Sequence, residues 1–415
     1  KLQDRLKNFI DENDIIPPNA RQMCLNSIEE GLPERAITRD LEWGIPAPFK
    51  GADEKTIYVW FEAVLGYVSA VKEWAEKMKG EDELFDEFWK DEETKTVFFI
   101  GKDNIIFHLI IFPGLLMAYN DDKTEGEKLV LPYNVSSTEF LMYEKDKFSK
   151  SHGVGIWIDE ALDLAPLDYW RFTLIYNRAE TSDTSFLWSE FENNLKTLND
   201  NIGNFIHRTL TFIENKFDLK VPEQLEIDKR DREFIRQMNQ AVERTDQFLY
   251  NFELRKAIRE VVELGKAGNI YLNDKAPWHV IKEDKKAAGH VFNLCAQAVY
   301  ALAVLLSPFI PDSSSKILDM LNIPADGIAF SADEITFQSV NAGTEIKSPE
   351  PLFQKLDVEE IKEELKTMKE KKKSSMEGPE TLSYEEFKML DMRVAEIVEA
   401  ERVPRTDKLL KLRVD

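Results

Sequence analysis

The segment with the clearest chemical potential is a short cationic loop, Lys147-Phe148-Ser149-Lys150-Ser151-His152-Gly153-Val154-Gly155. Two lysines three residues apart, two hydroxyls and two glycines make a mobile loop that can hydrogen-bond to phosphate oxygens. A lysine aimed at developing phosphate charge contributes about 1.5–3 kcal/mol through a charge-assisted hydrogen bond. Taken alone, however, such a loop is more often an ordinary solvated loop than a nucleotide site.

Four segments, in order along the chain, resemble one enzyme family. The loop is similar to the Lys-Met-Ser-Lys-Ser signature of class I aminoacyl-tRNA synthetases, with Phe148 in the methionine position. Phe99-Ile100-Gly101-Lys102-Asp103-Asn104-Ile105-Ile106-Phe107-His108 resembles the segment of methionyl-tRNA synthetases that contacts the ribose of ATP. Two earlier segments also match: Arg39-Asp40-Leu41-Glu42-Trp43-Gly44-Ile45-Pro46 and Tyr58-Val59-Trp60-Phe61-Glu62-Ala63-Val64-Leu65-Gly66-Tyr67. A single motif would be weak support, whereas four in the family's order favour methionyl-tRNA synthetases.

The resemblance implies a role for each matching residue. Lys147 and Lys150 are the implied catalytic residues, because they would stabilise charge on departing pyrophosphate. Gly101, Asp103 and Lys150 are implied to bind ATP, with the glycine admitting the ribose and the carboxylate accepting bonds from its hydroxyls. The implied methionine pocket consists of Trp60, Ala63, Tyr67, Phe107 and His108. Aromatic walls suit a polarizable thioether, and the Tyr67 hydroxyl could hydrogen-bond its sulfur. Without the resemblance, core packing is the usual role of such aromatic residues.

The sequence also departs from the family's pattern. Val64 stands where the bacterial pattern has proline and Phe112 where it has tryptophan, which leaves the shape of the pocket open. The family's first ATP signature, a His-Ile-Gly-His-like motif, does not occur in the 415 residues, and neither do its Cys-x-x-Cys zinc knuckles. Pro17-Pro18-Asn19-Ala20-Arg21 resembles the tail of the family's connective insertion. The resemblance therefore predicts a fragment that lacks the N-terminal half of the catalytic domain, is inactive alone, and holds no metal; zinc is expected only in the missing part.

A second set of residues resembles the anticodon-binding site of the same family. Asp200, Asn204 and Arg208 recur every four residues and form a polar row on one helix face, a pattern that usually marks a solvated face. Asn204 and Arg208 match the anticodon-reading helix of the family, whereas Asp200 stands where the bacterial pattern has asparagine and is assigned no contact. Pro277 and Trp278 match the family's anticodon-stacking pair. A tryptophan held exposed after a proline can stack on an unpaired base, which contributes about 1–3 kcal/mol.

The elements that would position these residues change in type along the chain. Residues 56–61, 96–100 and 129–135 are β-branched and aromatic runs that predict strands, and the apolar residues 105–119 predict a buried crossover helix. This order predicts a parallel, doubly wound sheet, with the cationic loop just past its strands. From about residue 187 an apolar stripe recurs every three or four positions: Leu187, Phe191, Leu195, Leu198, Ile202, Phe205, Thr209 and Ile213. Helical patterns at 230–250, 252–272 and 284–307 complete a predicted helix bundle.

The remaining segments are predicted to be irregular or to begin a new module. Residues 309–353 are rich in turn residues, 355–373 form a charged, helix-prone linker, and 393–398 predict a strand. The end of the chain resembles the start of the tRNA-binding OB-fold domain of many methionyl-tRNA synthetases. About two of the five strands of that barrel fit in the remaining residues.

The composition limits the class of protein. Hydrophobic residues make up 43% of the chain and aromatic residues 11%, as expected for a globular protein. The 54 basic and 77 acidic residues give a formal charge of −23, which argues against a nonspecific DNA binder. Cys24 and Cys295 lie too far apart in sequence for a zinc knuckle, and we expect no apolar run to be long enough to span a bilayer. We therefore expect a cytoplasmic protein with no membrane or DNA partner.

The prediction as a whole is an α/β plus all-α fold. It comprises the second half of a Rossmann-like doubly wound parallel sheet, an α-helical anticodon-binding bundle and a partial OB-fold. The expected boundaries are 1–155 for the catalytic half, 156–190 for a stem-contact region, 191–353 for the bundle, 354–380 for a linker and 381–415 for the truncated OB-fold. The resemblance implies a methionine–tRNA ligase that uses methionine, ATP with Mg²⁺ and tRNA(Met), and that dimerises through a complete OB-fold domain. The alternatives are a non-catalytic tRNA anticodon-binding module and a class I ligase for another amino acid.

Overall fold

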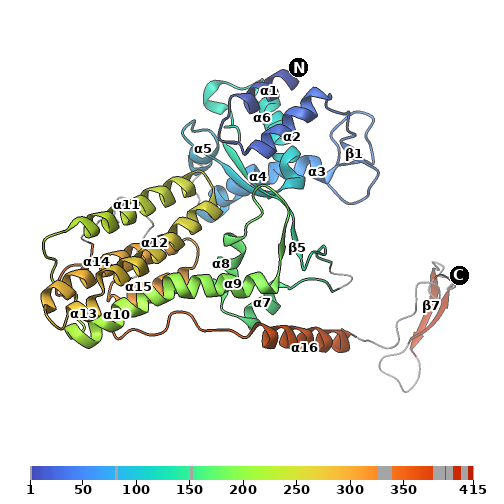
Figure 1. Cartoon of the computed structure of the whole chain (residues 1–415). Helices are drawn as coiled ribbons and strands as arrows, with labels where there is room; N and C mark the ends of the chain where they lie inside the picture. The colour runs from blue at the N-terminus through green and yellow to red at the C-terminus, as the bar shows by residue number, and fades with distance from the viewer. Residues whose placement is uncertain are drawn as a thin grey trace. The chain divides into compact units, whose positions relative to one another are not determined.

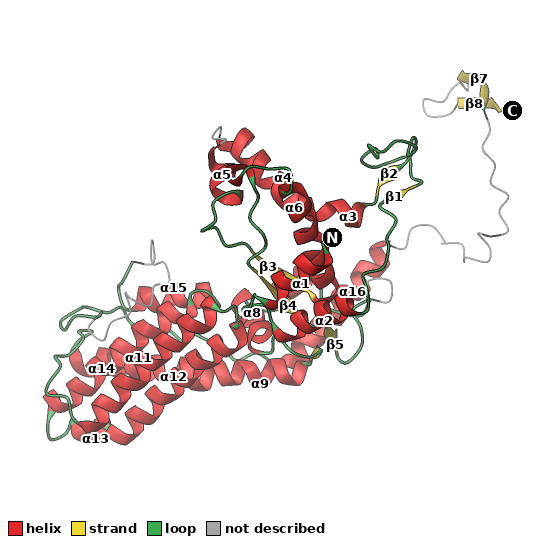
Figure 2. Cartoon of the chain, turned by 90° about the horizontal axis from the view of Figure 1, so that it is seen from above, coloured by secondary structure: helices red, strands yellow, loops and turns green. Residues whose placement is uncertain are grey.

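The computed structural model describes residues 2–79, 83–149, 153–324, 339–376, 388, 396–402 and 410–414. The chain divides into two units, Lys1–Val358 and Glu359–Asp415. Within the first unit, an α/β part is followed by a bundle of long helices, and Figure 1 shows these two parts as separate groups of elements. Figure 2 shows that strands lie in the α/β part while the bundle consists of helices.

The α/β part is built around one parallel strand pair. β3 (Val97–Gly101) pairs with β4 (Asn134–Thr138), and Gly101 lies opposite Thr138 at the carboxyl end of both strands. A π-helical turn over Phe107–Ile111 and α6 (Phe112–Asn120) connect the two strands. The predicted strand–helix–strand unit is therefore confirmed. Two helices before it, α1 (Gln3–Asp11) and α2 (Pro18–Glu29), bury Leu6, Ile10, Cys24 and Ile28 in the same core as α6.

Two of the predicted strands are wrong in extent. Residues 129–133 lie outside the hydrogen-bonded pairing of β3 with β4, which begins at Asn134. Pro132 has no backbone N–H group and so could not donate a hydrogen bond to a neighbouring strand. Only Thr56–Ile57 (β2) of the run 56–61 forms a strand, pairing antiparallel with Thr38–Arg39 (β1). The chain then turns into α3 (Val59–Glu62), where Trp60 is 53% exposed. Trp60 therefore faces outward, and β propensity alone cannot distinguish such an exposed aromatic residue from one on a half-buried strand.

A second parallel pair, which the sequence patterns did not predict, follows the first. β5 (Leu141–Tyr143) pairs with β6 (Thr184–Phe186), and α7 (Ile158–Leu164) and α8 (Leu167–Tyr176) lie between them in sequence. Next to this pair, Arg178 joins the sheet to the bundle. Its guanidinium donates to Ser136 Oγ at 2.8 Å and to the Phe252 carbonyl oxygen at 3.3 Å, and it pairs with Glu180 at 3.3 Å.

The bundle forms as the periodicity predicts. The stripe from 187 to 213 becomes α9 (Trp188–Leu198), a π-helical turn and α10 (Asn204–Phe217), with Phe191, Ile202 and Phe205 fully buried. Figure 1 shows α11 (Lys229–Tyr250), α12 (Leu254–Lys275) and α14 (Lys285–Leu306) side by side. The short α13 (Pro277–Val280) connects the last two. The expectation of an irregular segment from 309 is wrong for α15 (Pro311–Met320), because Pro311 occupies the first helical turn, where proline is compatible with a helix.

Two helical stretches are long and apolar enough to cross a membrane by length and composition, which corrects the expectation that no run was long enough. In Lys285–Leu306, 94% of the most apolar 18-residue stretch is buried inside the bundle. In Lys102–Asn120, 50% of the corresponding stretch is buried in the α/β part. Burial among other helices is typical of core helices, so these two stretches give only weak support for a membrane span.

The second unit contains a helix and a strand pair. α16 (Val358–Met376) confirms the helix predicted for 355–373. β7 (Ile397–Arg402) pairs antiparallel with β8 (Leu410–Val414). The predicted first strand at 393–398 overlaps β7 only at its end, and residues 393–395 lie outside the described residues.

Candidate functional site

An aromatic cluster forms where α3 and α4 (Gly66–Glu73) approach the crossover helix. The ring centroids of Trp60 and Phe107 lie 5.9 Å apart, and those of Tyr67 and His108 lie 5.6 Å apart. Tyr67 is 42% exposed and Ala63 is exposed, so the group opens to solvent on one side. The structure thus brings Trp60 to Phe107 and Tyr67 to His108, which are four of the five residues assigned to a methionine pocket, and Ala63 lies on the segment between Trp60 and Tyr67. Val64 and Phe112, the two departures from the family pattern, are buried in the core behind them.

His108 fixes the direction of the hydrogen bonds in this cluster. Burial lowers the pKa of His108, although its bond to the Asn104 backbone opposes this shift. Because Nδ1 must donate to the Asn104 carbonyl oxygen at 2.9 Å, Nε2 of the neutral ring accepts from the Tyr67 hydroxyl at 3.0 Å. The Tyr67 proton is therefore engaged by His108, and a hydrogen bond from this hydroxyl to a thioether sulfur would require it to turn away.

Gly101 and Asp103 lie at the carboxyl end of β3, the edge where open α/β sheets bind nucleotides. A Cβ at Gly101 would lie 2.8 Å from Asp103 Oδ1, so a larger residue would displace the carboxylate. Asp103 is exposed and available to accept hydrogen bonds from hydroxyls. Sequence reasoning missed the neighbouring Lys102, whose Nζ pairs with Glu139 at 2.8 Å and Asp183 at 2.6 Å. Hydrogen bonds to Asp183 and Glu139 raise the pKa of Lys102. These ion pairs connect the loop after β3, which carries Lys102, to the loop after β4 and the loop before β6.

The cationic loop begins just after β5. Ser149 and Val154 exchange backbone hydrogen bonds of 2.9 Å in both directions, so these two residues of the loop form an antiparallel bridge. Phe148 packs on Gly155, where a Cβ would collide with its ring, and lies 5.9 Å from the Tyr143 ring. Lys147 is exposed. Lys150 lies outside the described residues, so its assigned role stays a prediction.

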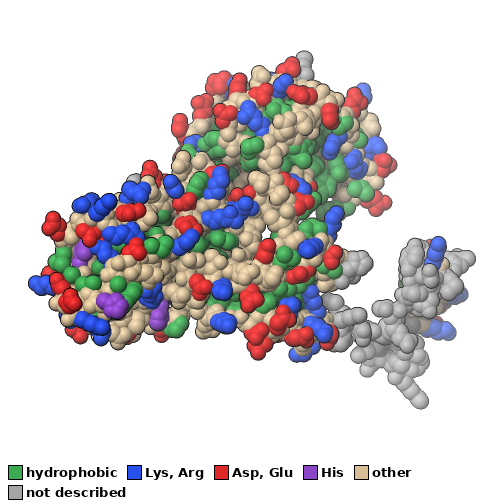
Figure 3. Space-filling model, viewed as in Figure 1, with side chains coloured by type: hydrophobic (Ala, Val, Ile, Leu, Met, Phe, Trp, Pro, Cys, Tyr) green, Lys and Arg blue, Asp and Glu red, His purple; other side chains and the backbone are tan. Residues whose placement is uncertain are grey.

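A second site lies at the end of the bundle that carries α10 and α13. Arg208 donates to the Oδ1 atoms of Asn269 at 3.1 Å and Asn273 at 2.9 Å, and its guanidinium carbon lies 5.4 Å from the centroid of the Trp278 ring. Trp278 is half-buried, Pro277 is buried and Asn204 is exposed one helical turn before Arg208. The structure therefore brings Arg208 and Trp278 together across 70 positions of sequence. Figure 3 shows histidine and basic side chains at this end of the bundle.

A buried polar network holds the α12–α13 corner that carries Trp278. Ala276 has a left-handed backbone (φ 43°), which turns the chain sharply after Lys275. Lys275 Nζ lies 2.6 Å from both Asp228 Oδ2 and Asp231 Oδ1. Asp231 is fully buried and also accepts from the Tyr271 hydroxyl at 2.8 Å and His290 Nε2 at 3.0 Å. The motifs gave no signal for this network, because its members lie on different helices.

We expect Asp231→Asn to lower the free energy of unfolding by about 3–5 kcal/mol at neutral pH, because it leaves Lys275 with one carboxylate. Burial alone would raise the pKa of Asp231, but bonds from Lys275, Asp228, His290 and Tyr271 outweigh it and hold the pKa well below its ordinary value. The difference from wild type should therefore be complete above about pH 5 and shrink as the pH falls below about 4. Urea unfolding followed by circular dichroism measures this difference in the free energy of unfolding.

The control is Asp274→Asn, which breaks only the partly exposed ion pair with Arg230 and should lower the free energy of unfolding by under about 1 kcal/mol. Equal losses of stability in Asp231→Asn and Asp274→Asn would contradict this account.

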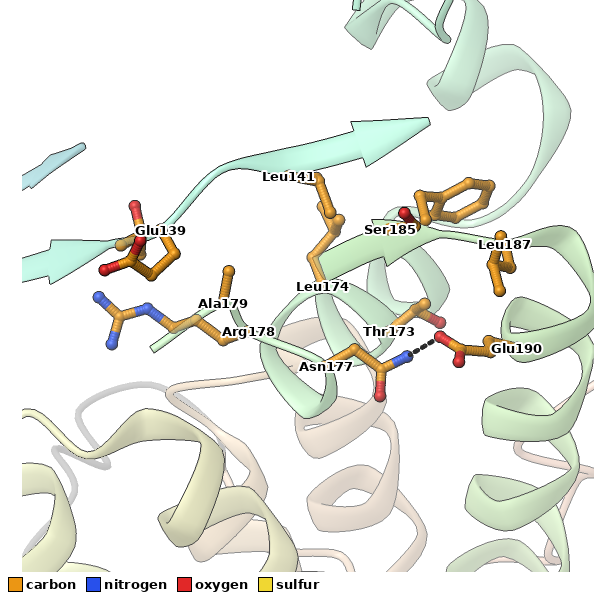
Figure 4. Close-up of a pocket in the computed structure, with 12 residues that line it drawn as sticks. Glu139, Leu141, Thr173, Leu174, Asn177, Arg178, Ala179, Ser185, Leu187 and Glu190 are labelled. Carbon is orange, nitrogen blue, oxygen red and sulfur yellow. Dashed lines mark hydrogen bonds between the residues drawn. The ribbon is translucent and has the colours of Figure 1, made fainter. Parts of the chain in front are cut away.

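A cavity of about 260 Å³ lies in the expected stem-contact region, between β5, β6, α8 and α9 (Figure 4). Asn177 donates to Glu190 across one side of it at 3.3 Å, and Leu141, Leu174 and Leu187 form apolar walls. Arg178 is the basic side chain among the described lining residues, and it is already paired with Glu180. This cavity thus offers no free cation for a phosphate. Among the described residues, no group of three or more His, Cys, Asp or Glu side chains could hold a metal ion.

Comparisons with known proteins match both parts of the chain. Residues 1–210 match the family model of class I tRNA synthetases (M), and residues 221–372 match that of the anticodon binding domain of methionyl tRNA ligase. The methionine–tRNA ligase of Thermofilum pendens is 45% identical over 371 residues, which cover 89% of this chain and 64% of that protein. That of Pyrobaculum islandicum is 46% identical over 371 residues, which cover 89% of this chain and 63% of that protein. The chain thus spans somewhat less than two thirds of the length of these relatives.

The fold also matches a solved structure. The free form of Mycobacterium tuberculosis methionyl-tRNA synthetase superimposes with a TM-score of 0.71 at 21% identity, covering 86% of this chain and 67% of that one. The architecture is therefore that of a Rossmann-like catalytic domain followed by a helical anticodon-binding domain. Since the first family model covers half of the chain and the relatives are more than 40% identical over most of it, the chain belongs to the methionyl-tRNA synthetase family of class I tRNA synthetases.

Proposed function

We propose that this chain acts in a methionine–tRNA ligase, which activates methionine with ATP and transfers it to tRNA(Met). The observation that supports this best is the presence of two sites in one chain. The aromatic cluster adjoins the Gly101–Asp103 edge of the sheet, and Arg208 and Trp278 meet at the end of the bundle. The relatives named above are methionine–tRNA ligases, and a second M. tuberculosis structure of the same fold is bound by methionyl-adenylate.

In the proposed first step, a carboxylate oxygen of methionine attacks the α-phosphorus of ATP. The bond from that phosphorus to the bridging oxygen of pyrophosphate breaks, and methionyl-adenylate forms without a nucleophilic side chain. Lys147 and Lys150 would stabilise charge on the departing pyrophosphate, and Gly101 and Asp103 would hold the ribose. The ATP is proposed to enter with Mg²⁺.

The proposed methionine pocket works by apolar contact. Trp60 and Phe107 would hold the thioether between aromatic rings, which suits a polarizable sulfur. Ala63 would leave space at the exposed side. Neutral His108 would orient Tyr67 through the hydrogen bond between them, and an uncharged ring favours an apolar ligand. In the second site, Trp278 and Pro277 would stack on an anticodon base, and Asn204 and Arg208 would read its edges.

Four further assignments are part of the proposal. Residues 381–415 are proposed to begin a tRNA-binding OB-fold domain, for which the antiparallel β7–β8 pair provides support. The complete domain would join two copies of the protein. We also propose a cytoplasmic location and a zinc site only outside this chain.

Methionine-dependent exchange between ATP and labelled pyrophosphate tests the proposed activity. We expect none from the 415-residue chain alone and clear exchange from a chimera that adds the histidine-pair segment of a relative. If the chimera is folded and binds tRNA but shows no exchange, the proposed ligase activity fails and the non-catalytic anticodon-binding module is favoured. Exchange driven equally by another amino acid would favour a different class I ligase.

A further inference from the structure

Lys102 lies inside the segment assigned to the ribose of ATP, but its own side chain has no assigned role. It begins the short helical turn that follows β3, and its side chain is 23% exposed. Its Nζ atom lies 2.8 Å from Glu139 Oε2, 2.6 Å from Asp183 Oδ1 and 4.3 Å from the centroid of the Phe140 ring. One ammonium group thus contacts two segments that are far apart in sequence.

These contacts lie where the β5–β6 pair begins. Glu139 and Phe140 lie between β4 and β5, and Asp183 directly precedes β6; Figure 4 shows Glu139 just before β5. The backbone N–H of Phe140 donates to Asp183 Oδ1 at 2.9 Å, and Asn19 Nδ2 of α2 donates to Glu139 Oε1 at 2.9 Å. Lys102 therefore fixes the first residues of both strands to the carboxyl end of β3.

The other end of the β5–β6 pair carries the cationic loop. β5 ends at Tyr143, and Lys147 follows four positions later. Trp188, just after β6, donates from Nε1 to the Tyr143 hydroxyl at 3.0 Å and from its backbone N–H to Glu144 Oε1 at 2.9 Å. The rings of Tyr143 and Phe148 lie 5.9 Å apart. Because β5 spans only about 10 Å, a shift at its first residue would displace Lys147 as well.

Charge makes the lysine necessary to this arrangement. In the part of the chain that the structure describes, Glu139 and Asp183 both make their ion pairs with Lys102. The side chain of Glu139 is only 14% exposed, so solvent screens its charge poorly. Without the ammonium group, two carboxylates would face each other, and like charges at short range repel. We therefore expect the start of the β5–β6 pair to move away from β3 when Lys102 is lost.

We propose that Lys102 is a positioning residue for adenylation, which sets the distance between the ribose-binding edge of the sheet and Lys147 on the cationic loop. This inference rests on the proposed function. Lys102 acts through Glu139 and Asp183 and does not itself contact the reacting atoms. A displacement of about 1 Å between groups that act on one substrate can lower the rate about 100-fold, so a precise distance matters to the reaction.

Kinetics in the chimera test this role. Lys102→Met should lower kcat of ATP–pyrophosphate exchange about 10- to 100-fold and leave the methionine KM near wild type, because the aromatic cluster lies on other elements. Lys102→Arg, which keeps the positive charge, should restore most of kcat. Asp183→Asn should lower kcat in the wild-type background but raise it in the Lys102→Met background, where it removes the repulsion. This reversal of sign is the signature of a positioning role.

Hydrogen exchange measured by mass spectrometry tests the geometry in the 415-residue chain itself. Lys102→Met should make the backbone amides of residues 139–143 and 183–187 exchange about 3- to 10-fold faster, with wild-type rates in the helix bundle. Adding Asp183→Asn should reverse part of this increase. The matched control is Lys128→Met, which breaks an exposed ion pair with Glu125 in the same α/β part and should leave both kcat and hydrogen exchange near wild type.

Three results would overturn the inference. The first is wild-type kcat and wild-type hydrogen exchange in Lys102→Met. The second is a lower kcat that Asp183→Asn does not reverse, with unchanged hydrogen exchange, which would mean that Lys102 contacts the substrate directly. The third is faster hydrogen exchange throughout the chain, which would mean a purely structural role. If the wild-type chimera shows no pyrophosphate exchange, the proposed function fails, and hydrogen exchange alone then decides whether Lys102 holds the strand pair.

Discussion

Lys150→Ala is expected to lower kcat of methionine-dependent ATP–pyrophosphate exchange by about 10²–10³-fold in the chimera, with little change in the methionine KM. The lysine would bind pyrophosphate most strongly when negative charge develops on it during bond cleavage. Its removal therefore raises the barrier of the chemical step without changing methionine binding. Initial rates measured over a range of methionine concentrations separate the two effects.

The matched control is Lys145→Ala. Lys145 is an exposed lysine just before the loop, on a turn with a left-handed backbone (φ 73°), and no family motif includes it. The kcat of ATP–pyrophosphate exchange by Lys145→Ala should stay within a few-fold of wild type. An unchanged kcat in Lys150→Ala, or equal losses in both variants, would remove Lys150 from its assigned role.

Trp278→Ala is expected to raise the Kd for tRNA(Met) by about 5- to 150-fold, which corresponds to about 1–3 kcal/mol of lost stacking. The helices should persist, because Trp278 is half-buried on a four-residue helix and the Asp231 network holds the adjacent corner. Filter binding measures the affinity, and circular dichroism checks the fold.

Trp43→Ala provides the control for loss of an exposed tryptophan. Trp43 is 92% exposed in the α/β part, so its removal should leave both stability and tRNA affinity near wild type. If Trp278→Ala instead unfolds the bundle, or binding is unchanged, then Trp278 has a structural role and the anticodon assignment is wrong.

The sequence predicted helices well where apolar residues recurred with the helical period over a long segment. The apolar stripe through Phe191, Ile202 and Phe205 specified α9 and α10, because a buried helix face requires that spacing. The run 56–61 was wrongly predicted to be a strand throughout, because Trp60 is a β-prone residue that lies exposed on the short helix α3. The β5–β6 pair was missed because its two short strands lie 40 residues apart, and its pairing depends on tertiary structure.

Only those residues of the two candidate sites that belong to family motifs could be predicted from the sequence. Motifs identified Tyr67, His108, Arg208 and Trp278, and the structure brings them together in the expected two groups. Motifs could not identify the Asp231 network, because it joins helices through side chains that are unremarkable in sequence. The direction of the Tyr67 hydrogen bond was also inaccessible, since it follows from the backbone bond that His108 makes.

Aminoacylation by the chimera tests the central claim most directly, because it requires both sites at once. The measurement compares the charging of tRNA(Met) with that of the same tRNA carrying a changed anticodon, using each of several labelled amino acids. The account predicts that methionine is attached to the CAU tRNA and that changing the anticodon sharply lowers kcat/KM. Charging that is indifferent to the anticodon, or that prefers another amino acid, would contradict it.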